Sequence, residues 1–480
     1  MIEIHKYKLN PLYITIKTHN QQYLSDLKNY FTDYVEGFQF TPKYKSGQWN
    51  GKICLFKNNI LPYGLLADVI RFTKKEYPLV NLKIDKDVSQ MFKGYDADIE
   101  PSLSKVPRDY QLDCILACLK FKRGIIRSST ASGKSLVIAY IINDLFEQNL
   151  IKQSLIIVPT ISLCQQFQSD MIEYGINKDR IGLVWEKEHS FDKDIVIATW
   201  QSLSKFHSKL SQYQCVIGDE CHGIKSTELS KIFENCTNAD YRFGFTGTLP
   251  TSKLDTFNVK AFLGPVLRDY GAGELAEKGY VSKCSVNIIT ITYNTDYDGE
   301  YNEVKDNVFN NNFRMGTIGQ ITSNLDSNVL ILVSKVEKEG KILKDYFDSL
   351  KINREIIFLY GDSDVKEREF WRKECENRKD IIIIATYGIF SVGVNIPSLK
   401  YLLFASPVKG KIRVLQSIGR TLRIHQDKTE GSVVFDIVDD VKYLKEHGIK
   451  RERYYSSEGF KIIEIDMKET IFLDEILFQK

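Results

Sequence analysis

From about residue 98 onward, short runs of Val, Ile and Leu alternate with longer amphipathic stretches. Near-continuous apolar runs of this kind are typical of strands buried on both faces of a parallel sheet. A polar, Asn-rich stretch from about 292 to 328 separates two groups of predicted strands. They are GIIR, SLIIVP, DIVIAT and CVIGDE before it, and NVLILV, EIIFLY, DIIIIAT, KYLLFA and GSVVFDIVD after it. The pattern therefore predicts two α/β domains in tandem. After Asp440 it predicts a packing helix and a strand-like tail.

The first 97 residues follow a different pattern. Short apolar and aromatic segments (LYITIK, FQFTPKYK and KICLFK) are separated by turn signals such as Ser46-Gly47 and Asn50-Gly51. This alternation predicts a small α+β domain that contains a β-hairpin. The expected domains are residues 1–97, 98–268 and 269–480.

Composition and charge narrow the function only slightly. The formal charge of +3 indicates no global basic surface, so any surface that binds nucleic acid must be local. The nine cysteines form no Cys-x-x-Cys pair, and we expect reduced, mostly buried thiols and no structural zinc. Cys114 and Cys118 lie one helical turn apart, where packing in a core is the favoured explanation. No apolar run approaches the ~18 residues that span a bilayer, and we expect a soluble, intracellular protein.

The stretch SSTASGKS, residues 128–135, has the features of a phosphate-binding loop. It follows a predicted strand and precedes the amphipathic stretch SLVIAYIINDLF, so backbone N–H groups and a helix N-terminus would face an anion. Gly133 would allow the backbone to approach phosphates closely. Ser128 stands where the usual G-x-x-x-x-G-K-[ST] pattern has glycine, which is acceptable if its φ is negative. Alone, the Gly-Lys-Ser tripeptide is equally compatible with a helix start that carries a solvated lysine.

A pair of carboxylates strengthens the nucleotide interpretation. In CVIGDECH, Asp219 and Glu220 come at the end of an apolar strand, where one carboxylate can orient Mg²⁺ and the next can polarise water. An isolated Asp-Glu pair is more often only a polar strand end. Together with a phosphate loop on an earlier strand, it predicts a site of nucleotide hydrolysis.

With these motifs the sequence resembles the superfamily two helicases of the Asp-Glu-x-His type. The resemblance implies two tandem RecA-like lobes that hydrolyse ATP with Mg²⁺. Ser128 departs from the family pattern, and so does Ala131, where many relatives have glycine, and we expect a slightly tighter loop. The stretch 264–283 resembles the crossing between the lobes. The motifs occur in the family's order: PRDYQ (107–111), STASGKS (129–135), VPTISLCQQ (158–166), ATWQSL (198–203), DECH (219–222), TGT (246–248), IATYGIFSVGVNIP (384–397) and QSIGRTLR (416–423).

The resemblance implies catalytic roles in both lobes. Lys134 should reach the β- and γ-phosphates, Ser135 and Asp219 should hold Mg²⁺, and Glu220 should orient the attacking water. Arg420 and Arg423, three apart on a predicted helix, should project from one face as arginine fingers. The alternative for these arginines is a solvated basic helix face. The other implied ATP contacts are Arg108, Gln111, Thr130, Ala131, Ser132, Gly133 and Gly393.

The resemblance also implies nucleic-acid contacts and a coupling element. Hydroxyls and backbone N–H groups at strand ends can hold phosphates without reading sequence. An ordinary turn-forming role is equally compatible with each of these residues. His222 would couple the nucleotide site to Thr246 and Thr248, with a packed core histidine as the alternative. The implied strand contacts are Pro159, Thr160, Thr199, Gln201, Thr386 and Gly388.

The segment TPKYKSGQWNGKICLFK, residues 41–57, interleaves Lys43, Lys45 and Lys52 with aromatics such as Trp49. On a hairpin, this combination suits phosphate contact and base stacking, although aromatics that face a core explain it equally well. The pattern G-x-W-[DN]-G followed by NILPYGL resembles the amino-terminal domain of phage recombination helicases of the UvsW type. That resemblance implies a DNA-binding domain ahead of a monomeric motor, located in the host cytoplasm if phage-encoded. The motor would act on branched, duplex or single-stranded DNA and DNA–RNA hybrids by fork regression, Holliday-junction branch migration and R-loop unwinding.

Four other functions compete with this interpretation. An RNA helicase, or a duplex translocase that does not separate strands, would share the motor motifs. A nucleic-acid binding or annealing protein with a vestigial ATPase is disfavoured because Lys134, Asp219, Glu220, Arg420 and Arg423 are all intact. A small-molecule kinase is disfavoured by the second lobe with its paired arginines.

Overall fold

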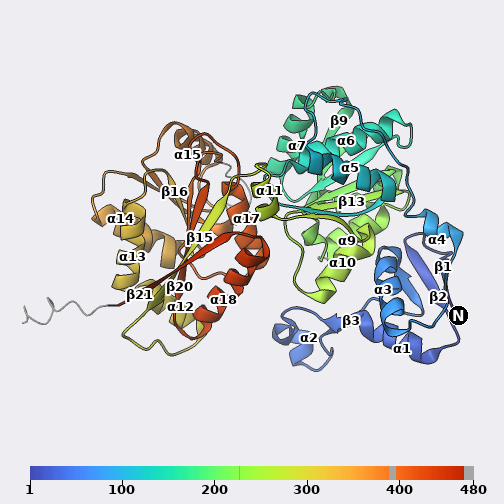
Figure 1. Ribbon diagram of the computed structural model, residues 1–480, viewed down its shortest axis with the longest axis horizontal. Coiled ribbons are helices and arrows are strands. Elements are labelled where there is room, and N and C mark those ends of the chain that lie inside the picture. Colours follow the sequence, from blue (N-terminus) through green and yellow to red (C-terminus); the bar gives the residue numbers. More distant parts are fainter. Residues whose placement is uncertain (226, 389–395, 470–480) are drawn as a thin grey trace, which may run out of the picture. The chain divides into compact units, whose positions relative to one another are not determined.

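The computed structural model describes residues 1–225, 227–388 and 396–469. The chain divides into two compact units, whose elements are labelled in Figure 1. The first unit comprises Met1–Ser128 and Gly133–Asp269, and the second comprises Ser129–Ser132 and Tyr270–Lys480. Among the described residues, no helix is long and apolar enough to cross a membrane.

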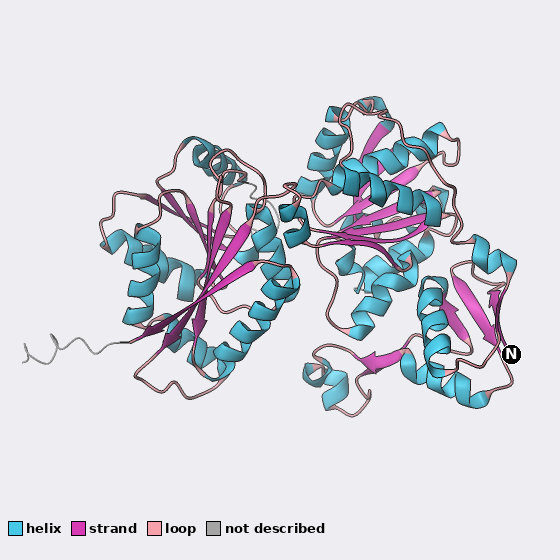
Figure 2. Ribbon diagram, viewed as in Figure 1, coloured by secondary structure: helices cyan, strands magenta, loops and turns pink. Residues whose placement is uncertain are grey.

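The amino-terminal part of the first unit is a four-stranded sheet with helices packed on it (Figure 2). Its elements are β1 (Ile2–Lys6), β2 (Tyr13–Lys17), α1 (Gln21–Tyr30), β5 (Ile60–Pro62), α3 (Leu66–Glu76), β6 (Leu82–Ile84) and α4 (Lys86–Gln90). The strand order is β5-β2-β1-β6, and β1 runs antiparallel to β2 and parallel to β6. Ile2, Ile4, Ile14 and Ile16 are buried because alternate side chains of these strands face the core. The predicted α+β region is confirmed.

The predicted hairpin within residues 41–57 is wrong. The paired strands are β3 (Thr32–Tyr34) and β4 (Lys52–Cys54), which lie far apart in sequence. Between them the chain forms the 3₁₀ turn η1 (Phe38–Phe40) and the short helix α2 (Pro42–Lys45). The helix starts because the Thr41 side chain accepts a hydrogen bond from the Tyr44 N–H and proline occupies the first turn.

The first unit also contains an eight-stranded sheet that matches the first predicted lobe. Its order is β10-β9-β11-β8-β12-β13-β7-β14, with parallel pairing from β9 to β7 and an antiparallel β10 at one edge. All four predicted strands are confirmed. The strands are β7 (Arg123–Ser128), β8 (Ser154–Val158), β9 (Ile181–Trp185), β10 (Glu188–His189), β11 (Ile195–Thr199), β12 (Cys215–Asp219), β13 (Tyr241–Thr246) and β14 (Val266–Tyr270). The helices are α5 (Asp109–Phe121), α6 (Lys134–Glu147), α7 (Ile161–Glu173), α8 (Trp200–Leu203), α9 (Thr227–Asn235) and α10 (Lys253–Leu263).

The small amino-terminal sheet and this lobe share one hydrophobic core. Phe31 packs against Phe257 of α10 with ring centroids 5.1 Å apart. The Tyr63 hydroxyl donates to the Phe262 carbonyl at 3.0 Å, and Lys260 pairs with the buried Asp68 at 3.1 Å. The NILPYGL segment therefore docks the amino-terminal sheet onto α10. The domain boundaries themselves stay predictions.

The second unit is a seven-stranded parallel sheet with helices on both faces (Figure 1). Its order is β17-β18-β16-β19-β20-β15-β21. All five predicted strands are confirmed, as are the packing helix α18 and the tail strand β21. The strands are β15 (Cys284–Thr292), β16 (Val329–Val333), β17 (Glu355–Leu359), β18 (Ile381–Thr386), β19 (Tyr401–Phe404), β20 (Ser432–Asp439) and β21 (Lys461–Lys468). The helices are α11 (Ala272–Glu277), α12 (Tyr301–Phe309), α13 (Asn312–Ser323), α14 (Ile342–Ser349), α15 (Val365–Asn377), α17 (Lys411–Thr421) and α18 (Lys442–Ser457).

The cysteines behave as packing residues, as expected. All nine are free thiols, and only Cys54 and Cys284 are less than fully buried. Burial raises the pKa of the Cys114 and Cys164 thiols to about 12, which makes them unreactive near neutral pH.

Candidate functional site

The phosphate loop lies between β7 and α6, as predicted. Ser128 is the last residue of β7, so its backbone is extended and this position does not need glycine. Ala131 and Gly133 have left-handed φ angles of 69° and 75°. Glycine suits position 133 because a residue with a Cβ rarely adopts this conformation, and a Cβ there would also displace the Gln111 side-chain amide, which would lie 2.6 Å away. The loop leads directly into α6, whose first residue is Lys134.

The PRDYQ segment is tied to this loop. The Gln111 side chain accepts a hydrogen bond from the Arg108 N–H at 2.9 Å, which caps α5. The same side chain donates to the Gly133 carbonyl at 3.3 Å. The structure therefore places the predicted adenine-contacting segment beside the predicted phosphate loop.

Asp219 has the environment of a cation ligand. It ends β12, and its Oδ1 atom is buried without a hydrogen-bond donor from any residue that the structure describes. Burial and the neighbouring Glu220 raise the pKa of Asp219, while the nearby Lys134 ammonium opposes the shift. A buried carboxylate oxygen with no donor is the group that a hard divalent cation would satisfy. The hydroxyl of Ser135 lies 2.9 Å from the Tyr174 hydroxyl, so its partner would change if it bound Mg²⁺.

Glu220, His222, Thr246 and Thr248 form one hydrogen-bonded group. Nδ1 of His222 lies 3.0 Å from Oγ1 of Thr246 and 3.2 Å from Oε2 of Glu220. The Thr248 N–H donates to the Thr246 hydroxyl at 3.2 Å. Glu220 has φ of 51°, a left-handed conformation that is strained for a residue with a Cβ and is typical of functional sites. The predicted hydrolytic and coupling residues are thus in direct contact.

The predicted strand contacts of this lobe gather at the carboxyl ends of β8 and β11, which are neighbours in the sheet. Gln201 is exposed, and its side-chain amide donates to the Pro159 carbonyl at 3.3 Å. Thr160 caps α7 by accepting from the Leu163 N–H. Thr199 is buried, and its hydroxyl donates to Ser202 at 3.0 Å. Contact with a nucleic-acid strand stays a prediction for all of them.

In the second lobe, Thr386 ends β18 and the exposed Gly388 follows it, whereas Gly393 lies outside the described residues. Arg420 lies on α17, but the expectation that Arg423 shares this helix is wrong because α17 ends at Thr421. The Thr421 carbonyl accepts hydrogen bonds from the Lys428 ammonium at 2.8 Å and the Ser432 hydroxyl at 2.5 Å. These bonds occupy the carbonyl that would continue the helix.

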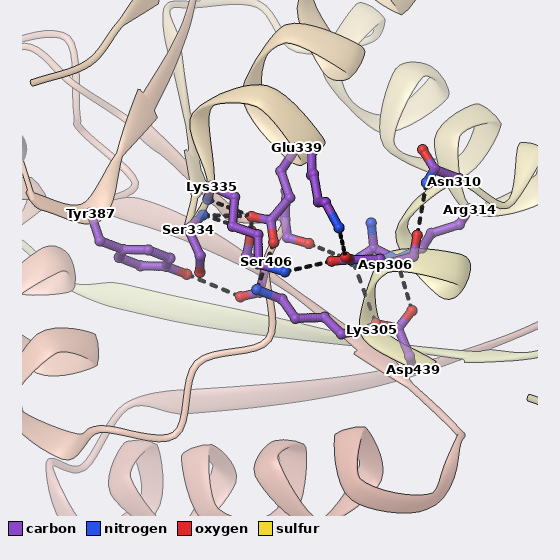
Figure 3. Close-up of polar contacts among 12 residues, drawn as sticks. Lys305, Asp306, Asn310, Arg314, Ser334, Lys335, Glu339, Tyr387, Ser406 and Asp439 are labelled. Carbon is purple, nitrogen blue, oxygen red and sulfur yellow. Dashed lines mark hydrogen bonds and ion pairs between the residues drawn. The ribbon is translucent and has the colours of Figure 1, made fainter. Parts of the chain in front are cut away.

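Sequence reasoning missed a buried polar network in this lobe, shown in Figure 3. Glu339, on a π-helical turn over Val336–Lys341, accepts from the Ser334 N–H at 2.6 Å and forms an ion pair of 2.6 Å with Lys305. It also accepts from the Ser406 hydroxyl. Burial alone would raise the pKa of Glu339, but Lys305 and these hydrogen bonds hold it below its ordinary value.

The same network reaches the segment after β18. The Tyr387 hydroxyl donates to the Ser406 carbonyl at 3.2 Å (Figure 3). Nearby, the fully buried Arg314 pairs with Asp439 at 2.8 Å. These bonds join the carboxyl ends of β16, β18, β19 and β20. The one sequence signal was Asp439 at a strand end, the position that Asp219 has in the first lobe.

The basic segment is exposed at the lysines. Lys43, Lys45 and Lys52 are exposed, whereas Trp49 is half-buried. The Trp49 indole N–H donates to the Lys52 carbonyl at 3.0 Å. The predicted contacts of this segment with nucleic acid stay predictions.

Comparison with known families gives three adjoining matches. Residues 5–85 match the family described as "DNA helicase UvsW, N-terminal". Residues 104–251 match "Type III restriction enzyme, res subunit", and residues 314–425 match "Helicase conserved C-terminal domain". The order of the three agrees with a small amino-terminal region followed by two motor lobes.

Individual relatives extend this result. The chain is 28% identical to the ATP-dependent DNA helicase uvsW of Enterobacteria phage T4, across 91% of this chain and 94% of the relative. It is 24% identical to the DNA 3'-5' translocase XPB2 of Sulfurisphaera tokodaii, across 72% of this chain and 84% of the relative. The solved structure of the type ISP restriction-modification enzyme LlaBIII bound to DNA shares the fold, with a TM-score of 0.58 at 13% identity over 84% of this chain and 34% of that chain. The chain belongs to the superfamily two helicases and is a UvsW-like, ATP-hydrolysing member.

Proposed function

We propose that this helicase uses Mg²⁺-bound ATP to remodel branched DNA, acting as a monomeric motor. It would regress forks, migrate four-way junctions and unwind DNA–RNA hybrids. The similarity to the phage T4 helicase over most of both chains supports the proposal, as does the match of residues 5–85. The observation that carries it is the contact between Glu220, His222 and Thr246, because it joins a hydrolytic carboxylate to a segment of predicted coupling function.

The nucleotide would be held by the loop from Thr130 to Gly133, with Ser132 and Ala131 inside it. Lys134 would neutralise the β- and γ-phosphates, and Arg108 and Gln111 would contact the adenine. Ser135 and the donor-free Oδ1 of Asp219 would hold Mg²⁺. The ion, when bound, supplies positive charge against the charge that develops on the transferred phosphoryl group.

Glu220 would orient the attacking water. Its carboxylate is held by His222, and the strained backbone at Glu220, the residue after β12, fixes the direction of the side chain. A movement of the Thr246–Thr248 segment would therefore change the position of the carboxylate through His222. Hydrolysis would in this way depend on what the coupling segment contacts.

The second lobe would supply the remaining groups. We assign Arg420 and Arg423 the role of arginine fingers, which typically accelerate hydrolysis by ~10³ to 10⁵. Gly393 would contact the nucleotide. The DNA strand would lie against Pro159, Thr160, Thr199 and Gln201 in the first lobe, and against Thr386 and Gly388 in the second.

The test is the ATPase rate of the full chain with a fork, a four-way junction, linear duplex, single-stranded DNA or RNA. The proposal predicts that branched DNA stimulates hydrolysis most and that Lys134→Ala abolishes hydrolysis on every substrate. Strongest stimulation by RNA would instead favour an RNA helicase. Strongest stimulation by linear duplex, without strand products on gels, would favour a duplex translocase.

A further inference from the structure

Residues 32–54 form a small module, called here the aromatic module, that consists of β3, η1, α2 and β4. Phe38 is its centre. The Phe38 ring stacks on Tyr34 with centroids 4.6 Å apart and meets the edge of Tyr44 at 4.7 Å. A Cβ on Gly51 would lie 2.3 Å from the same ring, and Gly51 has φ of +80°. Gly51, the second glycine of the G-x-W-[DN]-G pattern, is therefore needed for the backbone to pack against the Phe38 ring.

Trp49 also serves the interior of the module. Its indole N–H donates to the Lys52 carbonyl, and its backbone N–H donates to the Lys43 carbonyl at 3.1 Å. The exposed aromatic side chains of the module belong to other residues, because Trp49 is half-buried. Phe40 is 73% exposed, Tyr34 46% and Tyr44 38%. Phe40 and Tyr44 lie on η1 and α2, which pack against each other.

Lysines lie beside two of these rings. Lys43 and Lys45 flank Tyr44 on α2 and are exposed, and the Lys52 ammonium lies 4.6 Å from the centre of the Tyr34 ring. The carboxylates of the module are Asp33, which accepts a hydrogen bond from the Tyr34 N–H, and Glu36. Lysines that neutralise phosphates beside free aromatic faces are the elements of a single-strand binding surface.

We propose that the aromatic module binds unpaired bases of branched DNA by stacking them on Phe40 and Tyr44, while Lys43 and Lys45 contact the adjoining phosphates. The inference rests on the proposed function. Bases inside a duplex are already stacked on each other, so exposed rings select the unpaired nucleotides at a branch point. The module is part of the first unit, which would present these rings from the same body that carries the phosphate loop helix.

The test measures DNA binding by the full chain through fluorescence anisotropy, using single-stranded DNA, a fork with unpaired bases at its branch, and linear duplex. Phe40→Ala should weaken binding to the first two about tenfold, the effect of losing one stacked base, and change duplex binding less than about twofold. Leu79→Ala is the matched control, because Leu79 is 99% exposed in the same unit but outside the module. It should leave all three affinities unchanged.

Replacing Lys43 and Lys45 by alanine should weaken binding to every DNA and reduce its salt dependence by about two phosphate contacts. The inference would be overturned if Phe40→Ala lost the same affinity for duplex as for single-stranded DNA, or lost no affinity for any DNA. The second result would point to a protein partner for the aromatic module. Thermal unfolding of Phe40→Ala should match that of Leu79→Ala. ATPase stimulation of the wild type by branched DNA is measured in parallel, and its absence would count against the proposed function rather than the stacking surface alone.

Discussion

At the scale of single residues, the clearest division of labour is between Asp219 and Glu220. Asp219 presents a buried oxygen with no donor among the described residues, whereas Glu220 contacts His222 at 3.2 Å. The first suits a cation and the second suits a water molecule held for attack. Adjacent carboxylates thus acquire different roles from their surroundings.

Glu220→Gln should retain ATP binding and lower the hydrolysis rate by about 10² to 10⁴, because the amide cannot accept a proton from water. Nucleotide binding by filter retention and the single-turnover rate separate the two effects. Glu228→Gln, at an exposed position on α9, is the control and should behave as wild type. A Glu220→Gln enzyme that hydrolyses ATP normally would remove Glu220 from the mechanism.

His222→Ala should leave basal hydrolysis present but lower its stimulation by DNA about two- to tenfold, the range expected for the loss of one hydrogen bond. Thr246→Val keeps the side-chain shape, removes the hydroxyl that lies 3.0 Å from Nδ1, and should give the same loss. The ratio of stimulated to basal ATPase measures the effect. Unchanged ratios in both variants would mean that His222 is only a packing residue.

At the scale of elements, the second lobe depends on the ion pair between α12 and the π-helical turn. Lys305 is 6% exposed and Glu339 is 1% exposed in their side chains. Glu339→Gln should destabilise the protein by about 3 to 5 kcal/mol, because Lys305 is left as an uncompensated buried charge. Adding Lys305→Met should recover part of that loss, as chemical denaturation would show.

The exposed pair Glu337 and Lys341, 2.7 Å apart, provides the comparison. Glu337→Gln should change the free energy of unfolding by less than about 1 kcal/mol. Equal effects of Glu337→Gln and Glu339→Gln would show that the buried pair does not stabilise the loop after β16.

Helix α18 carries a group that should make the protein sensitive to acid. Burial, together with positive charge from Lys409, Arg451 and other cations, lowers the pKa of His447 to about 4. An unfolded chain binds a proton at this residue near pH 6.5, so the unfolded state holds more protons than the native state between the two values. Stability should therefore fall as pH drops from about 6.5 to about 4.

His447→Gln should flatten that part of the stability curve, measured as the thermal midpoint against pH. His19→Gln, at an exposed position, should leave the curve unchanged. A wild-type curve that is flat over this range would contradict the shift.

The nine strands predicted for the two lobes are all present, whereas others, among them β9, β13 and β15, were not predicted. Runs such as SLIIV, IVIAT, VLILV and IIIIAT became strands whose side chains are buried on both faces of a sheet. β13 (YRFGFT) escaped notice because it carries Arg242, a fully buried residue whose guanidinium donates to the Phe233 and Ala239 carbonyls. No local pattern shows that a buried arginine will find main-chain partners.

The residues of the candidate site also fall into two groups, those that a local motif predicts and those that only the folded chain brings together. The phosphate loop, DECH and TGT are local motifs whose spacing identifies them, and the structure brings them together. Lys305 and Glu339 are far apart in sequence and belong to no motif, so only the folded chain reveals the pair. The helix that was expected to hold Arg423 ends early because Lys428 and Ser432 capture the Thr421 carbonyl.

At the scale of the whole molecule, the docking of the amino-terminal sheet onto α10 decides whether the aromatic module belongs to the motor. Gly64 lies against the main chain of α10, and a Cβ there would be 2.0 Å from the Lys260 carbonyl oxygen. Gly64→Ala should cost about 1 to 3 kcal/mol of stability through overpacking. Gly316→Ala, where a Cβ meets open space, is the control.

Limited proteolysis should cleave Gly64→Ala between the amino-terminal sheet and the first lobe faster than wild type or Gly316→Ala. The same variant should lose activity on branched DNA while keeping basal ATP hydrolysis. Unaltered proteolysis and stability would mean that the NILPYGL segment is not the anchor.

The most direct measurement is the conversion of a labelled four-way junction into its branch-migration products by the full chain with Mg²⁺ and ATP. The proposed function predicts products with the wild type, none with Lys134→Ala and none when a non-hydrolysable analogue replaces ATP. Product formation by Lys134→Ala, or vigorous DNA-stimulated hydrolysis by the wild type without any product, would contradict it.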